Sequence, residues 1–228
     1  MKLIKSAIIR RLVILSIVLF STIIDLNAQS EQFRNLAQFL FPEFSKSIVK
    51  MKVGKDLTLM LNYNIVTEKM VFIQKDKVYD MLNPEAVDTA IISSRKFIPA
   101  GKAFYEVILE GPLNLYVQHK GNIVEPGKPA AYGGTSQVSS STSLSRIDMG
   151  GGQVYNMKLP EDLIIKSAPV FLISINNNNF SFVNERQFLK LFPGKEKEIK
   201  SFIKKNRLKF ENPMDMIRLV QYCSQSVK

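Results

Sequence analysis

Cysteine, histidine and tryptophan are scarce in this sequence of 228 residues, which contains one cysteine, one histidine and no tryptophan. The lone cysteine, Cys223, excludes an intramolecular disulfide, a cysteine-rich scaffold and a thiolate zinc site. The lone histidine, His119, is the one base for a Ser-His-Asp triad, and no G-x-S-x-G elbow presents a serine to it. Stability must therefore come from packing, and nucleophilic catalysis lacks its usual sequence pattern.

A nucleophile to pair with His119 is equally hard to find. The serines of residues 136–145 lie in a run whose composition predicts flexibility, so they would hold no catalytic geometry. Cys223 falls on the apolar stripe of a predicted helix, where a thiol usually fills space without reacting. We therefore expect a structural or solvent-facing His119, an inert Cys223 and no catalytic residue.

Metal and phosphate sites also lack their patterns. Hard cations need alternating oxygen ligands, and the closest group of acids, Asp80, Glu85 and Asp88, is explained by solvated loops. The glycines at 133–134 and 150–152 belong to no G-x-x-x-x-G-K-[ST] motif. We predict neither metal nor cofactor. Two carboxylates that converge only in space, as in a glycosidase, would leave no pattern, so that alternative stays open.

The N-terminus has the three parts of a secretory signal peptide. Lys2, Lys5, Arg10 and Arg11 precede the uncharged residues 12–24, and the small residue Ala28 follows a short polar stretch. A membrane span needs roughly 20 apolar residues, which this run lacks. We predict a signal peptide at 1–28, a mature chain from Gln29 without a transmembrane anchor, and export to the periplasm or extracellular space.

Residues 57–73 form the densest apolar run after the N-terminus and have the pattern of a β-hairpin. The first half alternates with a period of two, and in the second half Met70 and Phe72 oppose Val71 and Ile73, as in a strand covered on both sides. The turn between the halves is assigned to Asn62, Asn64 and Thr67.

Further short runs rich in Val, Ile, Tyr and Phe occur at 47–53, 77–82, 87–93, 96–99, 103–110 and 113–120, separated by Gly, Pro, Asn or Asp. No helical pattern lies between them to support parallel crossovers, which disfavours a parallel nucleotide-binding sheet. The fold class predicted is α+β, with an antiparallel β-meander domain at 29–183, a sandwich or a partly open barrel.

Glycine, serine and threonine dominate residues 121–152, a composition that predicts a long mobile loop within the β domain. Strand texture resumes at 154–157, 163–174 and 179–183. Pro169 lacks an amide hydrogen, so residues 163–174 should be an edge strand, a bulged strand or two strands.

At Asn184 the apolar period changes to that of helices, which predicts a C-terminal segment at 184–228 packed on the sheet. Asn184 with Gln187 resembles a capping box, Asn206 should end a second helix, and Asn212-Pro213 should begin a third. The side chains expected to contact the sheet are Phe188, Phe192, Phe202, Ile203, Met216 and Val220, with Cys223 buried among them. Phe202→Ala should then be severely destabilising and Lys204→Ala nearly silent.

Eight basic residues gather in 190–209, against two acids, Glu196 and Glu198: Lys190, Lys195, Lys197, Lys200, Lys204, Lys205, Arg207 and Lys209. They could bind nucleic acid, anionic lipid or acidic polysaccharide. The sequence favours the alternative that these residues form the solvated face of an amphipathic helix and have no binding role. Aromatic side chains do not interleave with the lysines, and together with the export signal this disfavours nucleic acid.

Two segments, LNYNIVTEKMVFI at 61–73 and FLKLFPGKEKEIKSFIKKNRLKFENPMDMIRLVQYC at 188–223, resemble an uncharacterised group of exported proteins of Bacteroidota-type bacteria. The resemblance implies an envelope or secreted location and carries over no catalytic residue. We therefore expect a non-catalytic binding or structural module of the cell envelope, whose partner could be an envelope protein or an anionic envelope polymer. The alternative is a hydrolase acting on an envelope polymer, which a deep pocket lined by acids or by His119 would favour.

Overall fold

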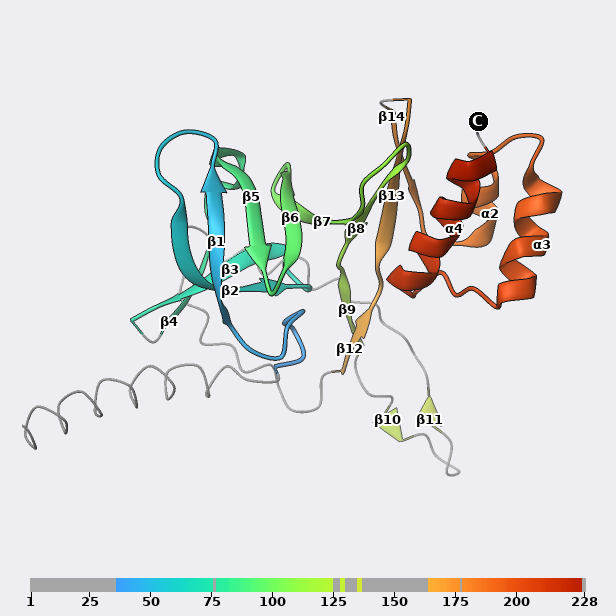
Figure 1. Ribbon diagram of the computed structural model, residues 1–228. Coiled ribbons are helices and arrows are strands. Elements are labelled where there is room, and N and C mark those ends of the chain that lie inside the picture. The colour runs from blue at the N-terminus through green and yellow to red at the C-terminus, as the bar shows by residue number, and fades with distance from the viewer. Residues whose placement is uncertain are drawn as a thin grey trace, which may run out of the picture.

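The computed structural model describes residues 36–75, 77–124, 128–129, 135–136, 164–176 and 178–226. The fold is α+β, as predicted, with a ten-stranded antiparallel sheet in the order β14-β13-β8-β7-β6-β5-β1-β2-β3-β4 (Figure 1). The strands are β1 (Ser45–Met51), β2 (Leu57–Asn64), β3 (Lys69–Gln74), β4 (Lys77–Asp80), β5 (Val87–Ile92), β6 (Arg95–Ala100), β7 (Ala103–Leu109), β8 (Asn114–Gln118), β13 (Val170–Ile175) and β14 (Asn178–Phe182). The sheet is not closed, since β14 and β4 are its two edges.

One half of the sheet curls into a partly open barrel. Strands β3, β2, β1, β5, β6 and β7 follow one another in the sheet, and β3 returns close to β7 without pairing with it. We call these six strands the barrel half. Their inward side chains are mostly apolar and buried, because curling is how a single twisted sheet covers its own face. This core includes Val49, Leu61, Tyr63, Met70, Ala90, Ile92, Phe97 and Phe104.

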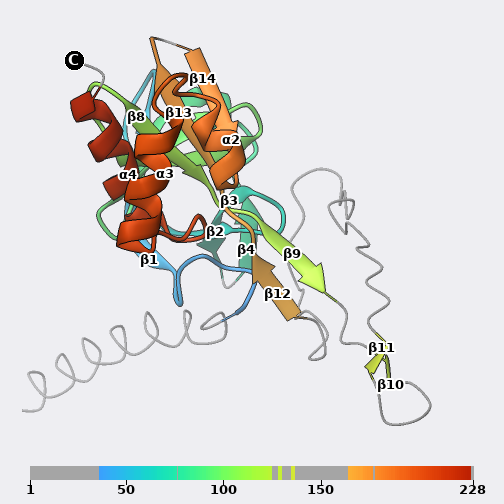
Figure 2. The same ribbon diagram turned by 90° about the vertical axis from the view of Figure 1, so that its right-hand side faces the viewer.

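The other half of the sheet is covered by helices (Figure 2). The helices are α2 (Glu185–Leu189), α3 (Glu196–Asn206) and α4 (Pro213–Ser226), and we call them the helical layer. Helix α4 contacts β7 and β8, while α3 packs on α2 and α4. The shared core combines β8, β13 and β14 with all three helices: Leu115, Val117, Phe171, Ile173, Phe182, Phe188, Phe192, Ile199, Ile203, Met216, Leu219, Val220 and Cys223.

Strand β7 joins the two halves. Its Phe104 belongs to the barrel core, and its Ile108 packs against the core beneath the helices. The pairing of β7 with β8 shifts register between Val107 and Leu109. An irregularity of this kind bends a strand and increases its twist, so the sheet turns here from the barrel toward the helical layer.

The predicted hairpin at 57–73 is present as β2 and β3. Met70 packs in the barrel core, whereas Val71 is buried on the opposite face with Phe44 and Val78, so both faces are covered as predicted. Asn64 accepts hydrogen bonds from the amides of Val66 and Thr67 and shapes the turn.

The assignment of Asn62 to that turn was wrong, because this residue lies within β2 and is completely buried. Its Oδ1 accepts a hydrogen bond from Phe41 N at 3.1 Å, and its Nδ2 donates to Phe41 O and Glu43 O at 2.9 and 3.2 Å. Asn62 therefore fastens the irregular segment before β1 to the barrel. Those backbone groups would otherwise be buried without partners.

Pro169 separates two strands, one of the predicted outcomes: β12 (Ile164–Ser167) and β13. Strand β12 pairs with β9 (Gly121–Val124), so residues 121–124, predicted as the start of a loop, are a strand instead. Gly121 is needed there, because a Cβ would stand 2.8 Å from side-chain atoms of Ile65 and Ile165. Within 125–163 only the short pair β10 (Lys128–Pro129) and β11 (Thr135–Ser136) is described, and the predicted strand at 154–157 lies outside the described residues.

The helix boundaries follow the predicted caps. Asn184 Oδ1 accepts a hydrogen bond from Gln187 N at 3.0 Å, and Asn212 Oδ1 accepts one from Met214 N at 2.9 Å. Helix α3 ends at Asn206, after which Arg207 adopts a left-handed conformation with φ of 51°. Phe202, expected against the sheet, is half-buried and stacks on Tyr222 of α4.

Candidate functional site

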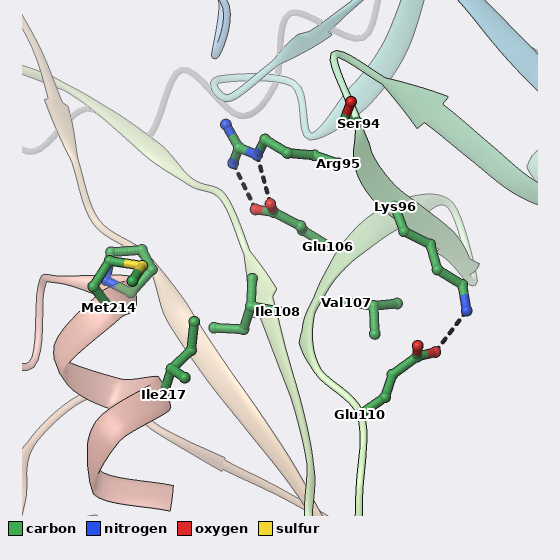
Figure 3. Close-up of a pocket in the computed structure, with 10 residues that line it drawn as sticks. Ser94, Arg95, Lys96, Glu106, Val107, Ile108, Glu110, Met214 and Ile217 are labelled. Atoms are coloured by element: carbon green, nitrogen blue, oxygen red, sulfur yellow. Dashed lines mark hydrogen bonds and ion pairs between the residues drawn. The ribbon is translucent and has the colours of Figure 1, made fainter. Parts of the chain in front are cut away.

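A cleft of about 510 Å³ opens where the start of α4 meets β6 and β7 (Figure 3). One wall carries charged side chains of the sheet, and the other carries the apolar side chains of Met214 and Ile217 from α4. The lining residues are Ser94, Arg95, Lys96, Glu106, Val107, Ile108, Glu110, Pro213, Met214 and Ile217. Because the cleft holds two carboxylates, it is the place to test the hydrolase alternative.

Glu106 forms the inner end of the cleft within a buried charge cluster. Its two carboxylate oxygens accept hydrogen bonds from Nε and Nη2 of Arg95, each at 2.5 Å. The ring Nε2 of His119 lies 2.6 Å from Glu106 Oε2 and donates to it, since an ionised carboxylate only accepts. The Arg95 guanidinium also lies 4.8 Å from the centroid of the Phe41 ring.

The sheet register explains why these residues meet. Glu106 of β7 is paired with Phe97 of the barrel core on one side and with Val117 of the core beneath the helices on the other. It therefore stands at the boundary of the two cores, where a carboxylate can be buried only with cationic partners. Arg95 begins β6 and His119 follows β8, so both flanking strands supply a partner.

Hydrogen bonding outweighs burial at Glu106. Burial alone would raise the pKa of this carboxyl, but the hydrogen bonds from Arg95 and His119 hold the pKa below its ordinary value. Glu106 is therefore ionised near neutral pH. A general acid of a glycosidase needs the opposite, a raised pKa that keeps the proton available.

The second carboxylate of the cleft, Glu110, is on its outer rim and is two-thirds exposed. It pairs with Lys96 Nζ at 2.6 Å. Glu106 thus lacks the environment of a proton donor, and both carboxylates of the cleft lie in ion pairs.

His119 is buried and not solvent-facing, the environment expected of a structural histidine. It is 7% exposed, lies behind Glu106 rather than in the cleft lining, and faces the rings of Tyr63 and Phe97. Cys223 is buried as expected, and burial raises the pKa of its thiol to about 12, so almost no thiolate is present near neutral pH.

Two of the three acids considered for a metal, Asp80 and Asp88, accept hydrogen bonds from neighbouring side chains. Asp80 at the end of β4 accepts a hydrogen bond from Lys69 Nζ at 2.7 Å, and Asp88 Oδ2 accepts one from the hydroxyl of Thr89. Within the described ranges, no group of three His, Cys, Asp or Glu side chains could hold a metal ion. Nor is any helix in those ranges long and apolar enough to cross a membrane.

The charge cluster was missed at the level of sequence, although one signal was available. Phe104, Glu106 and Ile108 alternate along β7 with the same parity, which puts a carboxylate on the inward face. A charge at such a position needs a partner in the neighbouring strands. The identity of that partner depends on the register, which short apolar runs do not specify.

The second candidate site is the outer surface of α3. Ile199 and Ile203 face the core, and lysines occupy the opposite side at 197, 200 and 204. Lys205 flanks this row. We call Lys197, Lys200, Lys204 and Lys205 the basic face. All four are exposed, and among the residues that the structure describes none of them forms an ion pair.

Comparisons of the chain with protein-family models, with curated proteins and with solved structures found no match. The fold itself therefore defines the class of the molecule. It is an open antiparallel sheet, half curled into a barrel and half covered by helices.

Proposed function

We propose that this protein is an exported, non-catalytic binding module of the cell envelope, in the periplasm or at the outer surface. The observation that carries the proposal is the basic face of α3, which is exposed and makes no ion pair with any residue that the structure describes, while the opposite side of the helix is buried. Unpaired charges of one sign attract a partner of the other. The signal-like N-terminus and the resemblance to exported Bacteroidota-type proteins support the location.

Fractionation of cells that make the full chain tests the location. We expect the protein in the periplasm or the medium, with an N-terminus at or near Gln29. Full-length chain confined to the cytoplasm or fixed in the inner membrane would contradict export. Passing solubilised envelope over the immobilised exported protein tests binding, and retention of a defined envelope component that 0.5 M salt releases is the expected result.

The hydrolase remains the second candidate because the cleft contains Glu106 and Glu110. It requires that the protein release soluble fragments from isolated envelope polymer, and that Glu110→Gln abolish the release. We expect neither the wild-type protein nor the Glu110→Gln variant to release fragments, since both carboxylates are held in ion pairs. Release that depends on Glu110 would replace the binding proposal with the enzymatic one.

A further inference from the structure

We propose that the basic face of α3 binds an acidic polysaccharide, a linear polymer that carries carboxylate groups. The inference rests on the proposed function as a binding module and names the partner and the surface. Lys197, Lys200 and Lys204 lie in a row along the helix, about 10 Å from first to last at 1.5 Å per residue. Such a row can contact several charges of one extended chain at once.

The position of α3 makes this row accessible. Helices α2 and α4 lie between α3 and β13, so α3 forms the outside of the helical layer (Figure 1). Ile199 and Ile203 bury its inner side, and Phe202 is occupied in a stack with Tyr222 whose ring centroids are 3.9 Å apart. The helix is thus fixed on one side and presents only polar groups on the other.

The chemistry of the row favours a polysaccharide over a lipid surface. An interfacial helix inserts an apolar face among the lipids, and the apolar face of α3 is already packed against α2 and α4. Among the described residues, the large exposed hydrophobic side chains nearest in the chain are Val183 and Met214, and neither is on α3.

The row also differs from a nucleic-acid site. Single strands are held by aromatic platforms, and the aromatic residue of α3, Phe202, is stacked within the protein. Phosphate groups are recognised best by the two-pronged guanidinium of arginine, whereas lysine is a compact charge with freely rotating donors. Lysines suit carboxylates that are presented at varying angles along a flexible polymer.

The test compares two triple variants that remove the same charge. The first is Lys197→Gln, Lys200→Gln, Lys204→Gln. The control is Lys46→Gln, Lys50→Gln, Lys52→Gln, which removes three exposed lysines of β1 and its following residue, in the barrel half of the sheet. Exposed Ile48 interrupts that second row, and β5 beside it carries Asp88. Both triples should unfold at the wild-type temperature.

The probes are polygalacturonate, neutral dextran, double-stranded DNA and phosphatidylglycerol vesicles. We expect wild type to bind polygalacturonate and not dextran, and the α3 triple to bind at least about tenfold more weakly, since each exposed charge contact contributes a few-fold in affinity. The control triple, and a triple of Lys→Arg changes at 197, 200 and 204, should stay within about twofold of wild type.

Each contrary result overturns the inference. Equal losses in the two glutamine triples would mean that net charge alone drives binding, and stronger binding to DNA or vesicles would mean another partner. If wild type ignores polygalacturonate but retains an envelope component equally well after the α3 changes, this inference fails and the proposed function stands. If the envelope column retains nothing, both fail.

Discussion

The two halves of the sheet bury their inner faces in different ways. Where helices cover the sheet, the buried side chains of the described residues are apolar apart from the thiol of Cys223. The barrel half and its boundary also bury polar and charged groups: Gln38, Ser47, Asn62, Asn64, Thr89, Glu106 and His119. The helical layer is thus held by apolar packing, whereas the barrel additionally depends on the hydrogen bonds of its buried polar groups.

The largest effect should come from the core under the helices. Phe188 is completely buried, with its ring centroid 4.9 Å from that of Phe182 and 5.1 Å from that of Phe192. Phe188→Ala should lower the free energy of unfolding by about 3–5 kcal/mol, the cost of a large cavity. Urea denaturation followed by circular dichroism measures it.

A control within the same half is Phe180 of β14, which is 40% exposed. Phe180→Ala should cost much less than Phe188→Ala. If the two changes have the same small effect, or if Phe188→Ala leaves the transition unchanged, the helices are a separate appendage and the comparison of two cores breaks down.

The boundary cluster comes next and should respond to pH. Glu106→Gln keeps the side chain's size but removes the charge that Arg95 and His119 face, at a cost of about 1–3 kcal/mol near neutral pH. The folded-state pKa of Glu106 lies below its ordinary value of 4.5. Its stabilising contribution is therefore fully present above pH 4.5 and is lost as the pH falls through the folded-state pKa.

The difference in unfolding free energy between wild type and Glu106→Gln should consequently shrink as the pH is lowered below 4.5. Thermal unfolding at a series of pH values measures this. The matched control is Glu110→Gln, whose exposed pair with Lys96 should contribute at most about 1 kcal/mol. A difference for Glu106→Gln that grows in acid would show that the carboxyl is protonated in the folded protein.

These contrasts explain which features the sequence could predict. The helical layer was predictable because Met216, Leu219, Val220 and Cys223 repeat at helical spacing, and a stripe of that kind needs only an apolar surface to pack against. Caps were predictable because Asn184 and Asn212 act on amides two or three residues away. Each of these interactions is local in the chain.

The polar contacts of the barrel were not predictable, because they join residues distant in the chain. Asn62 binds backbone groups of Phe41 and Glu43 about twenty positions earlier, and its residue type resembles a turn former more than a core residue. Glu106 meets Arg95 and His119 only once three strands are in register.

The candidate site on α3 was predictable in part. The lysines are visible in the sequence, but only the structure shows that none of them forms an ion pair with another described residue.

Phe202→Ala should have a smaller effect than the sequence indicated. The sequence placed Phe202 against the sheet, where truncation would be severe, but the ring lies half-buried at the edge of the layer and stacks on Tyr222. The loss should be about 1–2 kcal/mol, from part of the buried area and one aromatic pair. A loss as large as that of Phe188→Ala, measured in the same urea titration, would place Phe202 in the core.

The smallest effect on stability should come from Lys204, in the last turn of α3. A cation there interacts favourably with the helix dipole, by about 0.3–1 kcal/mol, but alanine has the higher helix propensity, and the two effects oppose each other. Lys204 is exposed and forms no ion pair within the described residues, so no packing or pairing is lost. Lys204→Ala should therefore change the free energy of unfolding by less than about 0.5 kcal/mol.

A loss above 1 kcal/mol in urea titration would mean that Lys204 stabilises the fold. Its contribution could then no longer be separated from binding, and the α3 triple would need a stability correction before its affinity is compared with the control.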